Sequence, residues 1–145
     1  MPRTRVLSRV LPLLLLLALP ATAQQDVWFK QKVKIPFALQ YKSEVVKPDE
    51  YLITIKTIEG GDKLLTLTSA KGEEVLRTRG EYGKVPPQDR NPKWQVDQGK
   101  LSITRVSDEK TPEKKWIVFN LDMKVIGGDF VRLMFKVPEA PAEAP

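Results

Sequence analysis

Apolar and polar side chains alternate with a period of two over much of the chain. In segments 33–41, 51–55, 117–125 and 131–137, every odd-numbered position carries a large apolar residue. Successive side chains of a β-strand point to opposite faces, so this alternation is typical of strands that bury one face. No segment shows the 3.6-residue spacing of an amphipathic helix.

Shorter alternating segments at 63–69, 74–79 and 100–106 predict further strands, and glycine pairs or polar stretches separate them. Many short strands with turn residues between them are typical of sandwiches and barrels. We therefore predict an all-β protein, an antiparallel β-sandwich or small barrel of about seven strands, with no substantial helix in the mature chain.

Two local features refine individual strands. Pro36 has no backbone N–H, so the segment 33–41 is either an edge strand or contains a break at this residue. A two-residue loop at Lys71-Gly72 would place Leu67 opposite Leu76 and gather apolar side chains on one face.

The last hairpin is predicted from the same reasoning. A two-residue loop at Gly127-Gly128 would mix an apolar face with a charged one, because a shift of one residue exchanges the two faces of a strand. A three-residue loop that includes Asp129 would instead pair Val125 with Val131. We therefore expect the odd loop.

The segment 81–99 differs from the rest because it holds three prolines and charges of both signs. These residues predict a long loop with a short extended piece over 94–96. The loop would carry Tyr82 and Trp94, whose rings are candidates for contacting a sugar or another ligand.

The stretch VVKPDEYLITI, residues 45–55, predicts a corner between two strands. Pro48 and Asp49 suit the two central positions of a type I turn, after which Tyr51 would enter the core. The stretch resembles the Leu-x-Pro-Gly-x-Tyr motif of prealbumin-like and Cna B-type β-sandwich modules. Together with VKIPFALQY it also resembles small secreted bacterial β-proteins of largely unknown function. The resemblance implies export and a β-sandwich, and Asp49 departs from it where the motif has Gly.

The first 23 residues have the layout of a cleaved secretory signal. Three arginines precede an apolar stretch of ten residues, and the small residues Ala21-Thr22-Ala23 follow. We expect cleavage after Ala23, which lowers the formal net charge from +6 to +3 because three arginines and no acidic residue are removed. The mature protein would then be periplasmic or extracellular and would not span a membrane.

The remaining chain predicts a single β-domain over 24–137 and a disordered Pro/Ala-rich tail over 138–145. The chain has no Cys, so the core must hold this domain without disulfides. With no His either, a Ser-His-Asp triad, a thiol nucleophile and a His- or Cys-ligated metal are excluded. Adjacent carboxylates in the turns point to opposite faces, so we predict no enzyme, no catalytic residue, no metal and no cofactor.

Basic residues are the remaining candidates for a binding surface. Two stripes lie opposite apolar faces: Lys30, Lys32 and Lys34 in the first strand, and Lys124, Arg132 and Lys136 in the last hairpin. If the first and last strands share one sheet, they give it a cationic outer face suited to an acidic envelope polymer or another envelope protein. The alternative is that the lysines keep an exposed edge soluble. No aromatic platform accompanies them, so we expect no nucleic acid partner.

These observations favour an exported, non-enzymatic β-sandwich module with an envelope-associated structural or binding role. The alternative is a carbohydrate- or polyanion-binding protein that uses the 81–99 loop and the cationic sheet face.

Overall fold

The computed structural model describes residues 27–96 and 98–142, so the expected signal segment lies outside the described residues. The described strands are β1 (Val27–Ile35), β2 (Leu39–Tyr41), β3 (Glu44–Val46), β4 (Asp49–Thr57), β5 (Lys63–Thr68), β6 (Glu74–Arg79), β7 (Glu81–Lys84), β8 (Lys100–Ser107), β9 (Lys115–Lys124) and β10 (Phe130–Pro138). Two short 3-10 helices, η1 (Glu59–Gly61) and η2 (Pro87–Asp89), complete the described elements.

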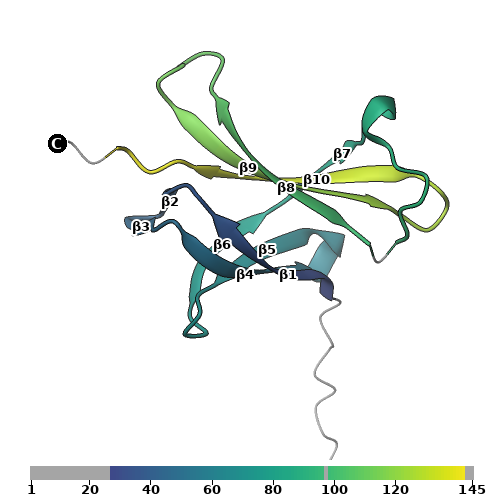
Figure 1. Ribbon diagram of the computed structural model, residues 1–145, viewed down its shortest axis with the longest axis horizontal. Coiled ribbons are helices and arrows are strands. Elements are labelled where there is room, and N and C mark those ends of the chain that lie inside the picture. The colour runs from purple at the N-terminus through teal and green to yellow at the C-terminus, as the bar shows by residue number, and fades with distance from the viewer. Residues whose placement is uncertain (1–26, 97, 143–145) are drawn as a thin grey trace, which may run out of the picture.

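The strands form two antiparallel four-stranded sheets that face each other (Figure 1). The first sheet has the order β1-β4-β5-β6, and the second has the order β7-β10-β9-β8. A small hairpin, β2–β3, lies beside them. The predicted antiparallel all-β sandwich is therefore confirmed, and of the two expected architectures the structure shows the sandwich.

The core lies between the inner faces of the two sheets, as the alternation predicts. Odd-numbered residues of β4, β5, β9 and β10 point inward, and most of their large apolar side chains are fully buried. Among the fully buried side chains are Ile53, Ile55, Leu65, Phe119, Leu121 and Phe135. Burial of such side chains contributes about 1.5–3 kcal/mol each, so this layer supplies most of the favourable free energy of folding.

The chain passes from the first sheet to the second between β6 and β7. Only Gly80 separates these two strands. A Cβ atom at Gly80 would lie 2.6 Å from Cε1 of Phe135, which is closer than real carbon contacts allow. Because Gly80 has no side chain, the chain can pass directly over the Phe135 ring as it crosses between the sheets.

Several strand predictions hold. Leu67 lies opposite Leu76 in the β5–β6 hairpin, but the predicted two-residue loop is wrong: the register shifts between Leu67 and Thr68, and the N–H of Ser69 donates to the carbonyl of Glu73 at 2.8 Å. β1 is an edge strand of the first sheet and ends at Ile35, so Pro36 marks both an edge and a break. The chain resumes as β2, which pairs with β3 rather than with either large sheet.

The last hairpin keeps the predicted faces but not the predicted register. Met123, not Val125, pairs with Val131, and the last pair before the loop is Lys124 with Phe130. Five residues therefore form the loop, in which the backbone N–H of Val125 donates to the carbonyl of Asp129 at 2.9 Å. The shift is two residues, so side chains stay on their expected faces, and alternation alone does not distinguish the two registers.

The corner before β4 also differs from the prediction. Asp49 already belongs to β4, where it pairs with Ile35, so the expected type I turn over residues 47–50 is wrong. The bend is confined to Lys47 and Pro48. The buried Tyr51 holds it, because its hydroxyl donates to the carbonyl of Lys47 at 2.6 Å.

Two segments expected to be irregular are ordered. Residues 81–84 form β7 and pair with β10, whereas residues 94–96 form no strand. Pro138, expected to begin the tail, is instead the last residue of β10, and the N–H of Ala140 donates to the carbonyl of Ala38 at 2.8 Å. Both segments depend on distant partners that local composition does not reveal. Within the described ranges, no helix is long and apolar enough to cross a membrane.

Candidate functional site

The two predicted basic stripes lie on different sheets. β1 belongs to the first sheet, and β9 and β10 belong to the second. The two sheets meet through their inner faces, so the outer face that carries Lys30 is separated by the whole sandwich from the one that carries Lys136. The two stripes therefore do not form a single cationic face.

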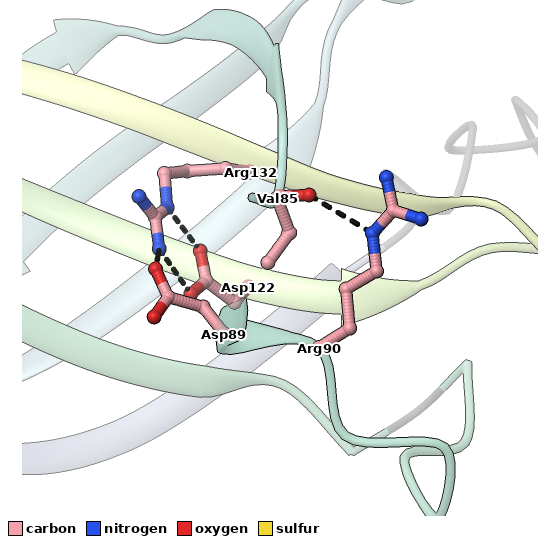
Figure 2. Close-up of polar contacts among 5 residues, drawn as sticks. All are labelled: Val85, Asp89, Arg90, Asp122 and Arg132. Carbon is pink, nitrogen blue, oxygen red and sulfur yellow. Dashed lines mark hydrogen bonds and ion pairs between the residues drawn. The ribbon is translucent and has the colours of Figure 1, made fainter. Parts of the chain in front are cut away.

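On the second sheet, Arg132 is neutralised by acidic neighbours (Figure 2). Its Nε and Nη2 donate to the two carboxylate oxygens of Asp122 at 2.6 and 2.8 Å. Nη2 also lies 3.4 Å from the carboxylate of Asp89 in η2. The hydrogen bonds to Asp122 raise the pKa of Arg132 above its ordinary value. This group clamps the η2 segment to the sheet and offers little free charge to a ligand.

The aromatic residue Trp94 lies in the same region and packs against Phe130, with ring centroids 6.3 Å apart. Arg90 and Lys124 also lie over the Phe130 ring, each about 5.8 Å from its centroid. Arg90 further donates its Nε to the carbonyl of Val85 at 3.0 Å (Figure 2). Trp94 therefore anchors the segment after η2 to the sheet.

Tyr82 lies elsewhere, on the edge strand β7, with 54% of its surface exposed. It faces Lys63, whose Nζ lies 3.7 Å from the ring centroid of Trp28 and 5.9 Å from that of Tyr82. Lys63 is buried and also donates to the hydroxyl of Thr57 at 3.0 Å. Tyr82 and Trp94 thus contact different clusters and do not form one ligand surface.

Lys63 was missed by the sequence predictions, although a signal was present. It is two residues before Leu65, so alternation places it on the inner face of β5. A buried ammonium is tolerated where aromatic rings and hydrogen-bond acceptors surround it. Its contacts join β1, β5 and β7, and so they link the two sheets.

On the first sheet, the predicted lysines remain accessible to a ligand. Lys30, Lys32 and Lys34 are exposed on the outer face of β1, two residues apart. The sequence predictions missed Lys56, which lies on the same outer face of β4 because it alternates with the buried Ile55. We call these four residues the lysine surface. Two residues along a strand span about 6.8 Å, so the three β1 lysines form a regular row.

Ion pairing separates the lysines from the arginines. In the part of the chain that the structure describes, all five ion pairs use an arginine and none uses a lysine. Arg77 and Arg79, at the opposite edge of the same outer face, pair with Glu74 and Asp62. Among the described residues, Glu50 lies across from Lys34 and brings a carboxylate to the lysine surface. The formal charge of the lysine surface with Glu50 included is therefore +3.

A surface groove lies at the β8–β9 hairpin. It has a volume of about 430 Å³ and is lined by Trp116 and Val118 together with acidic and basic side chains. Asp108 in its wall accepts hydrogen bonds from the backbone N–H groups of Lys110 and Thr111, which lower its pKa. Its carboxylate therefore serves the hairpin turn. Among residues 27–96 and 98–142, no three acidic side chains converge as a metal site would require.

Comparison with protein-family models, curated proteins and solved structures finds no significant match to this chain. The functional assignment therefore rests on the residues and their arrangement.

Proposed function

We propose that this protein is an exported, non-enzymatic β-sandwich module that binds an anionic polymer of the cell envelope through its lysine surface. The observation that carries the proposal is the regular row of three exposed lysines on one strand. Arginines of both sheets are held by carboxylates, whereas Lys30, Lys32 and Lys34 stand in a row on β1 with no ion-pair partner among the described residues.

The geometry suits a linear ligand. The three β1 lysines repeat at about 6.8 Å along one strand, so anionic groups along an extended polymer can meet them in succession. Lys56 widens the row onto β4. Thr54 lies beside Lys30 on β4, and Thr66 lies beside Thr54 on β5. Their side chains are small and polar and do not obstruct the row. Export is supported by the signal-like first 23 residues.

Binding of the purified exported protein to long-chain polyphosphate, with neutral dextran as the comparison, tests this proposal. The variant in which Lys30, Lys32 and Lys34 are all changed to Gln removes the row. At about 1 kcal/mol per lysine near an anionic surface, its affinity should fall by about a hundredfold at low salt. Wild-type binding should weaken between about 50 mM and about 300 mM NaCl, because salt screens exposed charges.

A matched control changes three exposed lysines outside the surface, Lys71, Lys93 and Lys110, to Gln. Both variants lose the same net charge, so only placement distinguishes them. Equal losses in the two variants would show that overall charge, rather than the lysine surface, governs binding. Equal affinity for dextran and polyphosphate would also contradict the proposal.

A further inference from the structure

A smaller cavity adjoins the groove at the β8–β9 hairpin, and Lys136 lines both. It lies between the β2–β3 hairpin, β6 and the last part of β10, and has a volume of about 220 Å³. It exists because β7 covers β10 only from Val131 to Met134. Beyond Met134, this edge of β10 has no strand of the second sheet beside it, and β2 and β6 approach it instead.

The cavity brings together three basic side chains from three separate elements. Lys42 comes from the β2–β3 turn, Arg77 from β6 and Lys136 from β10. The other lining residues are neutral: Gln40, Tyr41, Thr78, Val137 and Pro138. No acidic residue lines it, although Lys136 also lines the groove at the β8–β9 hairpin, whose wall includes Asp108 and Glu109.

Two carboxylates near the cavity reduce its charge without cancelling it. Glu74 pairs with Nε and Nη2 of Arg77 at 2.9 and 3.0 Å, which leaves Nη1 outside this pair. Glu44 lies across the hairpin from Tyr41 and forms none of the described ion pairs. The three basic residues and these two carboxylates together carry a formal charge of +1, and neither lysine ammonium group has an ion-pair partner in the described ranges.

The backbone at Lys42 supplies independent support. Its φ of 55° makes it the one described non-glycine residue in the left-handed region. It is the first residue of the two-residue loop between Tyr41 and Glu44, a position where a positive φ strongly favours glycine. Strained residues of this kind persist where surrounding contacts hold them, and they concentrate at binding sites.

The contacts that hold this turn also line the cavity. The side-chain amide of Gln40 donates to the carbonyls of Lys42 and Glu44 at 2.9 and 3.1 Å. Nζ of Lys42 lies 5.2 Å from the centroid of the Tyr41 ring. A glycine would form the same turn without strain, so the turn alone does not explain a lysine here. The ammonium group that it places at the cavity does.

From this convergence we propose that the cavity binds a phosphate group, with Lys42, Lys136 and Nη1 of Arg77 as its charged contacts. Charge-assisted hydrogen bonds from ammonium and guanidinium groups are the usual means of holding phosphate oxygens. The Thr78 and Tyr41 hydroxyls supply neutral donors. The cavity volume leaves room for the group that carries the phosphate. This site is separate from the lysine surface, and it stands whether or not that surface binds a polymer.

Titration of the purified, isotope-labelled exported protein with inorganic phosphate and with glycerol 3-phosphate, followed by NMR, tests the proposal. Saturable shifts should centre on residues 40–43, 77–78 and 136–138. Lys42→Gly removes the ammonium group and relieves the strained φ. It should weaken phosphate binding about two- to fivefold while leaving the urea midpoint unchanged or higher. Lys136→Gln should weaken binding by a similar factor.

Lys110→Gln, on the other groove, is the matched control and should bind phosphate as the wild type does. The variant lacking Lys30, Lys32 and Lys34 should also retain phosphate binding, so failure of the lysine-surface proposal is distinguishable from failure of this one. Phosphatidylglycerol vesicles compared with phosphatidylcholine vesicles separate a lipid phosphate from a soluble ester. Wild-type affinity in both Lys42→Gly and Lys136→Gln, or shifts centred elsewhere, would overturn the proposal.

Discussion

The ion pair between Asp122 and Arg132 should be a principal support of the second sheet's outer face. Asp122 lies on the outer face of β9, yet only 6% of its surface is exposed, and both its oxygens contact Arg132. Asp122→Asn keeps the shape of the side chain but removes its charge. Breaking a fully buried pair costs about 3–5 kcal/mol. Because the Arg132 side chain stays 23% exposed and water can reach it, we expect a loss of about 2–3 kcal/mol.

Replacing the other partner of the pair, Arg132, should destabilise the protein more. Arg132→Met leaves the Asp122 carboxylate without its partner, and that side chain is only 9% exposed. We expect a loss of at least about 3 kcal/mol. The double variant should lose less than the sum of the two, because the second change no longer breaks the pair. Asp89→Asn is the control: its side chain is 48% exposed and 3.4 Å from Arg132, so its loss should stay below about 1 kcal/mol.

Urea unfolding followed by tryptophan fluorescence measures all four variants. A blue or red shift of folded-state emission in Arg132→Met would additionally report on Trp94, since Arg132 ties the η2 segment to the sheet. Additive losses in the double variant, or a loss below about 0.5 kcal/mol for Asp122→Asn, would show that the pair does not clamp this face.

Two further predictions concern the core. Burial raises the pKa of the Tyr51 hydroxyl. The stability that the protonated hydroxyl contributes to the folded protein is therefore fully present below pH 10 and is lost as the pH rises above this value. Tyr51→Phe removes the hydrogen bond to Lys47 and should lower the free energy of unfolding by about 1 kcal/mol at pH 7. Above pH 10 the urea midpoints of the variant and the wild type should converge, and a constant gap between them would refute this linkage. Gly80→Ala should lose about 1–3 kcal/mol through its clash with Phe135, and unchanged stability would mean that the crossing is not tight.

How far the sequence predicts the structure depends on the range of the interaction. Alternation places Phe119, Leu121 and Phe135 in one core because a strand has a side-chain period of two. It also predicts the pairing of Leu67 with Leu76, although the two-residue loop assumed for it does not form, because a register shift beside Leu67 compensates for the change in loop length. The five-residue loop of the last hairpin lies beyond this reach, because registers two residues apart bury the same faces.

The candidate sites show the same division. Alternation by itself identifies the row of Lys30, Lys32 and Lys34, because it is a property of one strand. Whether that row joins Lys136 depends on which strands pair, and the long-range contacts of the core decide this.

The cavity at the β2–β3 turn is decided entirely by tertiary structure. Lys42, Arg77 and Lys136 are far apart in the chain and carry no shared motif. They meet because the chain crosses between the sheets at Gly80 and because β7 is too short to cover the end of β10. Sequence patterning determines which face of a strand a side chain occupies, and packing of the two sheets determines which side chains become neighbours.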